Sequence, residues 1–399
     1  MRLSALNEQD QKKLISLRRW LHAHPEVSRK EYKTAEYVRN FLNQNAAPDE
    51  VVDLAGAGFA VVYNGKNPGK TVMLRCELDA LPIHEVNEDL PYRSVYDGVG
   101  HKCGHDGHMT ILCGIAMILS YQRPQSGRVV LLFQPDEETG TGARDSVNHP
   151  DFKKIEPDYA FALHNFPGFP RNQIICRPGT MLSAVKFVAV KFHGKECHSA
   201  MPETGKNPAM AIAEITRAAR ELQNRFDKEN EYALVVPIYY EMGVSSSGVS
   251  PGYGEAHFTI RTCRNKVVDE MWTEFQSITQ EISTKHELEI EFEILENFAA
   301  TENYGEAVSL IENVAMENAF GYTTLEKPFR VGEDFGEILK LYNGALFGLG
   351  AGEDMPELHN PDYDFPEEII PSGIAMFRTL IERVLTGETC NDDISFAAE

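Results

Sequence analysis

The chain opens with apolar side chains at helical spacing and continues with short runs of branched residues. Between residues 8 and 45, leucine, alanine and valine recur every three or four positions, which predicts two helices separated at His24-Pro25. The predicted buried parallel strands that follow are short apolar runs closed by polar or glycine-containing loops, at 71–74, 129–133, 159–163 and 345–349. A helix is predicted at 109–119, with Asp106 ahead of it as a cap. Strands alternating with helices predict an open α/β sheet.

The middle of the chain has a different pattern. Amphipathic helices are predicted at 208–226 and 268–284, beside mostly antiparallel strands at 183–192, 232–240, 256–261 and 288–294. The α/β style then returns, with predicted helices at 307–319 and 373–385. The simplest arrangement is an α/β domain with a mostly parallel sheet, split into 1–182 and 296–399, and an inserted α+β domain at 183–295.

Charge and cysteine content narrow the classes of partner and compartment. Sixty acidic against 38 basic side chains give a formal net charge of −22, which repels nucleic acid and anionic membrane surfaces. The seven cysteines form an odd set without a CxxC pair, which favours a reducing cytoplasm over a secreted disulfide framework. The polar start of the chain and the lack of a run of about 18 apolar residues predict neither a signal peptide nor a membrane span.

Candidate metal ligands are densest at Gly100–His108, just before the predicted helix. Thiolate and imidazole are preferred ligands of Zn²⁺ and related ions, and Cys103 lies close enough to His105 to share one. This C-x-H pattern is weak by itself, because a helix start with solvated histidines has the same sequence.

Further candidates follow the predicted strands. Glu137 and Glu138 come after the strand at 129–133, and His164 closes the strand at 159–163. In open α/β sheets reactive groups gather at the carboxyl ends of strands. One carboxylate can ligate a metal while its neighbour takes a proton from water. Together, the clusters at strand ends supply enough donors for one or two divalent metals: Asp79, Cys103, His105, Glu137, Glu138, His164 and His359.

Two nucleophile hypotheses compete with the metal. Residues 248–252 match G-x-S-x-G, but Pro251 follows the serine and has no N–H for an oxyanion, and strand-like alternation continues where a helix is required. Cys103 near a histidine could ionise as a nucleophile. The neighbouring carboxylates and additional imidazoles fit a metal better.

The motifs as a set resemble metal-dependent amidohydrolases of the aminoacylase and carboxypeptidase type, in the branch of hippurate hydrolases and enzymes that cleave auxin–amino acid conjugates. The resemblance covers nearly the whole chain and is specific in combination. The matching segments, in order, are Arg19–Glu26, Cys103–His108, Phe133–Glu138, Leu163–Asn165, His198–Pro202, Glu333–Phe335 and Leu358–Phe365.

The resemblance implies a fold and a division of roles. The fold would be a zinc-peptidase-like catalytic α/β domain interrupted by a smaller α+β lid that commonly forms the homodimer interface. The implied metal ligands are Cys103, His105, Glu138, His164 and His359. Glu137 would be the general base and His198, on the lid, would stabilise the oxyanion, with Asp79 in support. Arg261 and Asn360 are candidate substrate contacts.

Three positions depart from the family pattern. Glu77 replaces the usual aspartate, Asp136 stands where alanine is common and adds a third negative charge beside the base, and Gly248 replaces an asparagine expected to contact substrate. These departures concern substrate identity more than reaction type.

We therefore expect hydrolysis of an N-acyl amino acid or a related small amide by a metal-activated water, with Glu137 as general base. The metal would be one or two ions of Zn²⁺, Mn²⁺, Co²⁺ or Ni²⁺, since mixed thiolate, imidazole and carboxylate donors tolerate several of them. A dipeptidase or carboxypeptidase-like activity and a non-catalytic ligand-binding member of the fold are the alternatives.

Overall fold

The computed structural model describes residues 6–228 and 231–387, which form two compact units with separate hydrophobic cores. The larger unit comprises the described residues up to Met181, Thr301–Glu326 and those from Asp334 onward. The smaller unit comprises Leu182–Ala300 and Lys327–Glu333. The insert expected at 183–295 lies within the first segment of the smaller unit.

The short segment Lys327–Glu333 packs with the insert and completes the smaller unit. The backbone N–H of Ser183 donates to the carbonyl of Val331 at 3.0 Å, and Leu182 forms an isolated bridge with Phe329. Local periodicity does not assign this segment to the smaller unit, because its pairing partners lie about 150 positions earlier in the chain.

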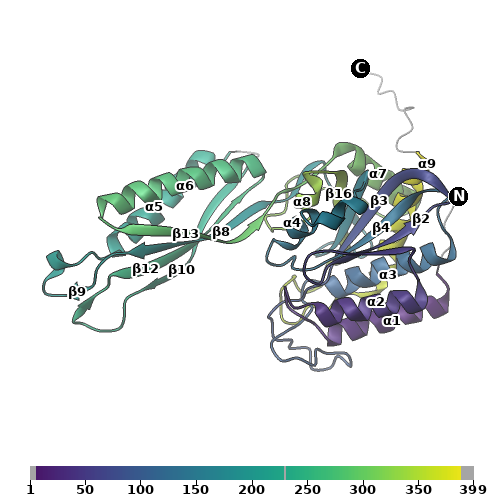
Figure 1. Cartoon of the computed structure of the whole chain (residues 1–399), viewed down its shortest axis with the longest axis horizontal. Helices are drawn as coiled ribbons and strands as arrows, with labels where there is room; N and C mark the ends of the chain where they lie inside the picture. Colours follow the sequence, from purple (N-terminus) through teal and green to yellow (C-terminus); the bar gives the residue numbers. More distant parts are fainter. Residues whose placement is uncertain (1–5, 229–230, 388–399) are drawn as a thin grey trace, which may run out of the picture. The chain divides into compact units, whose positions relative to one another are not determined.

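A large sheet organises the larger unit (Figure 1). In spatial order its strands are β1 (Glu50–Asp53), β2 (Phe59–Asn64), β4 (Ser126–Gln134), β3 (Asn67–Glu77), β5 (Tyr159–Pro167), β16 (Asn343–Gly352), β6 (Ile174–Cys176) and β15 (Tyr322–Thr324). The central strands β4, β3, β5 and β16 run parallel, which confirms the predicted mostly parallel α/β sheet. The antiparallel hairpin β1–β2 extends the β4 edge and is absent from the sequence prediction.

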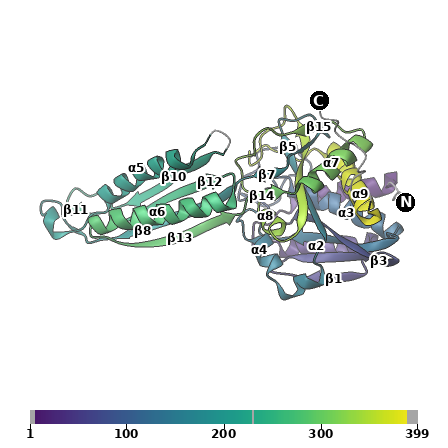
Figure 2. The ribbon, with the colours of Figure 1, turned by 90° about the horizontal axis from the view of Figure 1, so that it is seen from above.

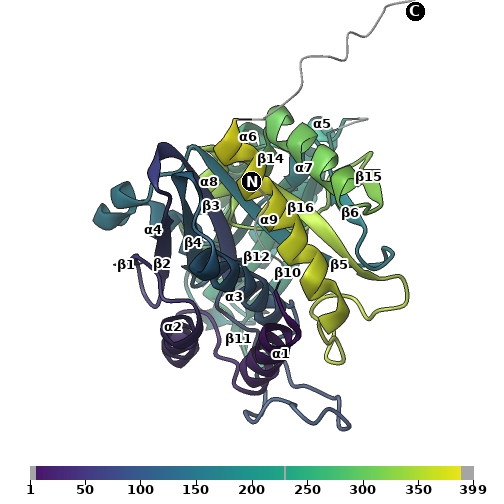
Figure 3. The same ribbon diagram turned by 90° about the vertical axis from the view of Figure 1, so that its right-hand side faces the viewer.

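Helices cover the sheet and leave its carboxyl edge to the loops. The helices of this unit are α1 (Glu8–Ala23), α2 (Tyr32–Asn45), α3 (His105–Tyr121), α4 (Gly142–Val147), α7 (Gly305–Glu317), α8 (Gly336–Leu339) and α9 (Ile370–Thr386). Short η1 (Pro150–Lys154) and η3 (Glu367–Ile369) and the two-stranded sheet of β7 (Gly179–Leu182) with β14 (Thr301–Asn303) complete it. Both α3 and α9 pack on β3, with α1 beside α3 (Figure 3). Apolar side chains from one face of the strands and from these helices form one core.

The first turn of α3 differs from the prediction. The helix begins at His105 rather than at residue 109, so Asp106 lies inside the first turn and is not its cap. Gly104 precedes the helix with φ of 93°, a left-handed conformation that favours glycine. A Cβ atom at this position would lie 2.4 Å from Oδ1 of Asn165. The glycine therefore lets the loop before α3 approach the end of β5 closely.

The smaller unit is a four-stranded antiparallel sheet with two helices on one face (Figures 1 and 2). The sheet order is β10 (Ala233–Met242), β12 (Tyr253–Thr262), β8 (Ala184–His193) and β13 (Glu289–Phe298). The helices are α5 (Ala209–Phe226) and α6 (Asn265–Lys285), and the remaining elements are β9 (Cys197–His198), η2 (Pro202–Thr204) and β11 (Val249–Ser250). A register shift interrupts the pairing of β13 with β8 after Ile294, and the Ile294 side chain is 48% exposed.

Within the described residues, the longest apolar helices fall short of what crossing a lipid bilayer requires.

Candidate functional site

Chemically reactive side chains gather at the carboxyl edge of the large sheet. β3 leads into Asp79, β4 leads into Glu137 and Glu138, and β5 carries His164. Parallel strands place their carboxyl ends on one edge, so segments far apart in the chain meet there. The start of α3 adds Cys103 and His105 to the same edge.

Asp79 links the histidine at the start of α3 to the turn after β4. His105 Nδ1 lies 2.9 Å from the carbonyl oxygen of Asp79, which can only accept, so Nδ1 carries the proton and Nε2 faces the other way. The Asp79 carboxylate accepts from Ser28 Oγ at 2.8 Å and from the backbone N–H of Glu138 at 2.9 Å. These contacts make Asp79 a positioning residue for both His105 and Glu138.

The two glutamates of the turn lie near the outward-facing nitrogen of His105. Glu137 Oε2 and Glu138 Oε1 are each 3.9 Å from His105 Nε2. His359 Nε2 approaches the same Glu138 oxygen at 3.6 Å. Glu138 therefore lies between a histidine of α3 and a histidine of the loop after β16.

Cys103 and His164 complete the cluster from the other side. Their Sγ and Nε2 atoms are 3.4 Å apart, and both residues are buried. His164 Nδ1 donates to the carbonyl of Asn165 at 2.9 Å, which directs Nε2 toward the thiol. Both α3-side and β5-side imidazoles thus present Nε2 to one region.

The donor set fits a divalent metal. Ligand atoms lie within 4.8 Å of one another in each of three overlapping groups: Cys103/His105/His164, Cys103/Glu138/His359 and His105/Glu137/Glu138. His105 Nε2 is buried and has no hydrogen-bond partner among the described residues, which is costly unless another species binds it. Thiolate, imidazole and carboxylate together suit zinc and neighbouring first-row ions. A further group, Glu77/His105/His108, is different, because both ring nitrogens of His108 are already hydrogen-bonded.

Burial and neighbouring carboxylates shift the pKa values of the candidate ligands. Burial disfavours a charged His105, but its hydrogen bond to Asp79 and the charges of Glu77 and Glu138 raise its pKa to about 10. Burial, with the Glu138 and Glu137 carboxylates nearby, raises the pKa of the Cys103 thiol well above its usual value. Burial lowers the pKa of His164 to about 3. Without metal, protons on His105 and Cys103 therefore take the place of the cation.

A buried hydrogen-bond chain runs behind the cluster. Glu77 Oε2 accepts from His108 Nδ1 at 2.7 Å, and His108 Nε2 lies 2.6 Å from Asn165 Oδ1. Asn165 Nδ2 continues to the hydroxyl of Tyr363 at 2.6 Å. The side chain of Glu77 thus reaches α3 at His108, three positions after the ligand candidate His105. His108 and Asn165 belong to the quoted motifs, but their roles depend on contacts that motif matching does not contain.

Asp136 does not add a third negative charge facing the base. Its carboxylate accepts from Arg29 Nε at 3.0 Å and from Thr139 Oγ1 at 2.7 Å, and it also contacts the hydroxyl of Thr141. The side chain closes the turn that carries Glu137 and Glu138, and Arg29 compensates its charge. Local turn geometry, with φ of 58° at Asp136, turns this carboxylate away from the expected direction.

Two predicted site residues lie in the smaller unit. His198 is exposed on β9, and its Nδ1 accepts from the backbone N–H of Ala200 at 3.1 Å. Arg261 on β12 donates to the carbonyl of Arg330 at 2.9 Å. Asn360, in the larger unit, is exposed beside His359. The segment with Ser250 forms β11 and is followed by strand β12, so it lacks the strand-to-helix turn of a serine nucleophile.

The pKa shifts predict that metal binding is coupled to proton release. At pH 7 the metal-free site keeps protons on His105, whose pKa is about 10, and on Cys103, whose pKa is raised. A metal must displace both protons, so affinity should rise with pH between about 7 and 10. Calorimetric titration of metal-free protein with Zn²⁺ in buffers of different ionisation enthalpy measures this release. Affinity that is independent of pH over this range would contradict the assignment of these groups as ligands.

The chain is similar to known proteins over most of its length. The model of peptidase family M20/M25/M40 matches residues 73–383, more than three quarters of the chain. An N-acetyldiaminopimelate deacetylase from Lactobacillus acidophilus is 28% identical over 381 residues, covering 94% of this chain and 98% of the relative. The enzyme of the same name from Leuconostoc mesenteroides is 28% identical over 396 residues, covering 96% and 100%.

Solved structures share the fold. A Bacillus subtilis protein described as a dinuclear metal binding peptidase of the M20 family is 25% identical, with a TM-score of 0.80 and coverage of 96% of this chain and 99% of that one. A Staphylococcus aureus protein described as an aminohydrolase superposes with a TM-score of 0.84 at 24% identity, covering 95% and 97%. The chain therefore belongs to peptidase family M20/M25/M40 and is a metal-dependent hydrolase of amide bonds that uses one or two divalent ions.

Proposed function

We propose that this protein hydrolyses the amide bond of N-acyl amino acids at the cluster on the carboxyl edge of the large sheet. The observation that carries the proposal is the convergence of five metal-ligating side chains, three of them buried, beside a second carboxylate. The proposed ligands are Cys103, His105, Glu138, His164 and His359. The acid, thiol and imidazole donors favour an enzyme over the alternative of a non-catalytic binding module.

Glu137 is the proposed general base. Glu137 is 5% exposed, and its Oε2 atom lies 3.9 Å from His105 Nε2, beside the proposed ligands. Divalent ions in this site would polarise the amide carbonyl and make water acidic enough to attack at neutral pH. Glu137 accepts the proton of the attacking water and then delivers it to the leaving amine.

Residues outside the cluster take supporting roles in the proposal. Asp79 holds His105 and the Glu138 backbone in place. His198 would stabilise the oxyanion, as the family resemblance implies, and Arg261 with Asn360 would contact the substrate. Arg261 suits a carboxylate, because a guanidinium binds carboxylate oxygens in pairs.

The named relatives indicate which substrate should be tested first. Two curated relatives at 28% identity are N-acetyldiaminopimelate deacetylases, so we propose an N-acetylated amino acid with this compound as the leading candidate. A dipeptidase or carboxypeptidase-like activity is the second candidate, since it differs only in the group that occupies the acyl side. The working compartment in this proposal is the cytoplasm, and neither nucleic acid nor membrane is a partner, in keeping with the net charge of −22.

A homodimer through the smaller unit is part of the proposal. β10 forms one edge of the four-stranded sheet, and it exposes Ile238, Tyr239 and Tyr240 by 54%, 43% and 46%. Unpaired edges with apolar side chains are suited to pairing with another chain. These exposed apolar side chains on β10 support a second copy of this chain as the partner.

Replacing the proposed base separates chemistry from metal binding. Glu137→Gln should lower kcat by about 10²-fold or more, because the amide cannot accept the proton of water. Metal content and the folded structure should stay unchanged. Glu138→Gln is the matched variant and should lose metal as well as activity. Elemental analysis and hydrolysis assays on both variants measure this, and substantial turnover by Glu137→Gln would sink the assigned role.

A substrate screen tests the acyl preference. We expect N-acetyldiaminopimelate and other N-acetyl amino acids to be hydrolysed with kcat/KM at least about tenfold above that for dipeptides, a difference of ~1.4 kcal/mol in transition-state binding. The assay is release of free amine by protein reconstituted separately with Zn²⁺, Mn²⁺, Co²⁺ or Ni²⁺. Faster cleavage of dipeptides would favour the peptidase alternative instead.

The oligomeric state tests the proposed interface. Ile238→Asp places a charge on the exposed edge of β10 and should shift the protein from dimer to monomer in size-exclusion chromatography with light scattering. Met316→Asp is the control, because Met316 is 59% exposed on α7 in the larger unit. A wild-type protein that elutes as a monomer would contradict the interface.

A further inference from the structure

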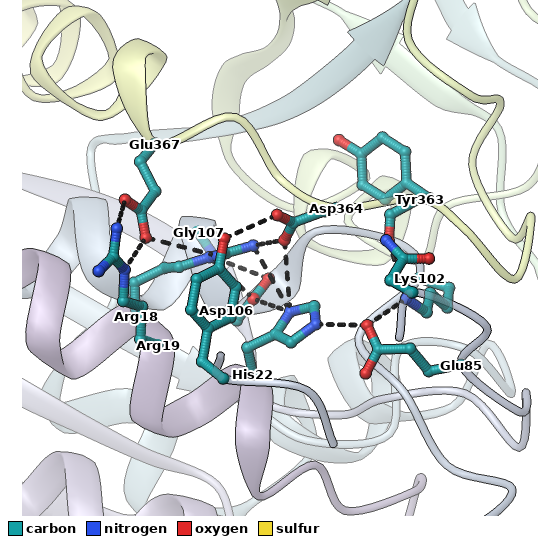
Figure 4. Close-up of polar contacts among 12 residues, drawn as sticks. Arg18, Arg19, His22, Glu85, Lys102, Asp106, Gly107, Tyr363, Asp364 and Glu367 are labelled. Atoms are coloured by element: carbon teal, nitrogen blue, oxygen red, sulfur yellow. Dashed lines mark hydrogen bonds and ion pairs between the residues drawn. The ribbon is translucent and has the colours of Figure 1, made fainter. Parts of the chain in front are cut away.

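A largely buried network of charged side chains includes Lys102 and Asp106 (Figure 4), which flank the proposed ligands Cys103 and His105 in the chain. It contains three cationic groups and three carboxylates, namely Arg18, His22, Lys102, Glu85, Asp106 and Asp364. His22 joins the carboxylates of Asp106 and Glu85 through its two ring nitrogens, each at 2.8 Å. Arg18 Nε lies 3.1 Å from Asp106, and the same guanidinium contacts Asp364. The mechanism proposed above uses none of these groups.

Lys102 is the member of this network adjacent to a metal-ligand candidate. Its side chain is completely buried, and a buried lysine requires partners for its charge. The ammonium donates to Glu85 Oε1 at 2.7 Å and to the carbonyl of Tyr363 at 2.9 Å. Its own carbonyl accepts from the backbone N–H of His359 at 2.8 Å. One residue therefore contacts the loop of His359 at two points, four residues apart.

The loop that carries His359 has little structure of its own. Residues 353–366 form neither helix nor strand, and His359 has φ of 66°, a left-handed conformation uncommon outside glycine. Its side chain is 50% exposed, whereas His105 and His164 are buried on α3 and β5. The position of the His359 imidazole therefore depends on contacts that the loop makes with its surroundings.

Those contacts come from two neighbouring segments. The backbone N–H of Val86 donates to Pro361 at 3.2 Å, and Asn87 Nδ2 donates to the carbonyl of Asp362 at 2.9 Å. Glu85, in the same segment, accepts from Lys102. Lys102 thus connects three irregular segments, 85–87, 102–103 and 359–363, around the thiol ligand.

We propose that Lys102 is a positioning residue that holds His359 in reach of Cys103 and Glu138. The inference rests on the ligand assignment in the proposed function and extends it to a residue that contacts no ligand through its side chain. The ammonium of Lys102 supports the loop at Tyr363, and the backbone carbonyl of Lys102 supports it at His359. Lys102 directly precedes Cys103 in the chain. Its contacts with the loop of His359 therefore limit movement of that loop relative to the Cys103 thiol.

Stability alone does not explain a buried lysine at this position. Replacing a buried ion pair by apolar groups of similar volume is often neutral, whereas removing one partner leaves a buried charge uncompensated. Two donors of the ammonium reach different segments, which an apolar side chain cannot imitate. Hydrogen bonds from His22 and Lys102 act against the effect of burial and lower the pKa of Glu85 to about 2, so this carboxylate stays charged and keeps the lysine in place.

The test compares metal binding in Lys102→Met, His359→Ala and wild type. Zn²⁺ affinity is measured on metal-free protein by competition with a chelator, and Co²⁺ spectra report the thiolate. We expect Lys102→Met to weaken the same binding step as His359→Ala, by about 10- to 100-fold, the usual range for residues that orient ligands. Amide exchange at His359 and Tyr363 in the metal-free protein should be faster in Lys102→Met. Unchanged affinity together with unchanged exchange would overturn the proposal.

Two controls separate positioning from the loss of a buried charge. Lys186→Met removes a lysine that is 8% exposed in the smaller unit and hydrogen-bonded to Asn297, and it should leave Zn²⁺ affinity unchanged. The double variant Lys102→Met/Glu85→Gln removes both charges of the pair and also serves if the single variant fails to fold. The metal defect should persist in the double variant. Restored affinity would mean that Lys102 only neutralises Glu85, and the proposal would be wrong.

A wrong assignment of His359 as a metal ligand would give a different experimental result. If His359→Ala leaves Zn²⁺ affinity unchanged, His359 is not a ligand and the proposed function must be revised at that residue. Amide exchange across residues 357–363 in Lys102→Met then decides separately whether the lysine orders the loop.

Discussion

A thiol, several imidazoles and adjacent carboxylates lie close together at one edge of the large sheet, and the surrounding chain must supply compensating charges and hydrogen bonds. Charged groups removed from water need partners, and the two glutamates after β4 would repel each other without a cation. In the metal-free protein, His105 supplies part of that positive charge, and Asp79 accepts from its other nitrogen. A divalent ion would compensate the negative charge of these carboxylates more completely than a proton does.

The supporting structure orients each ligand by a contact on its far side. Asp79 orients His105, the Asn165 carbonyl orients His164, and the turn closed by Asp136 holds the glutamates. Such contacts fix the ring orientation before a metal arrives, which lowers the cost of assembling the site. His359 alone among the histidines of the site comes from a loop without regular structure, and its orientation depends on the buried network around Lys102.

Much of the larger unit follows from local patterns. Continuous apolar runs predicted its central parallel strands, and helical periodicity predicted α1, α2, α3, α7 and α9. The hairpin β1–β2 was not predicted, although β2 is an apolar run of the same kind as the central strands. The first turn of α3 follows Gly104, whose left-handed conformation and close approach to Asn165 leave no room for a side chain, and no side chain caps the helix.

The sequence by itself determined the chemistry of this protein: which donors exist, that they follow strands, and which family their order matches. Strand ends of a parallel sheet must share an edge, so the meeting of these donors was predictable from topology. Only the tertiary structure decided where each side chain points. Asp136 accepts a hydrogen bond from Arg29, Asp79 contacts both His105 and Glu138, and Lys102 is buried against Glu85. Such orientations depend on backbone dihedrals and on contacts between residues far apart in the chain, and neither is encoded in a local pattern of residue types.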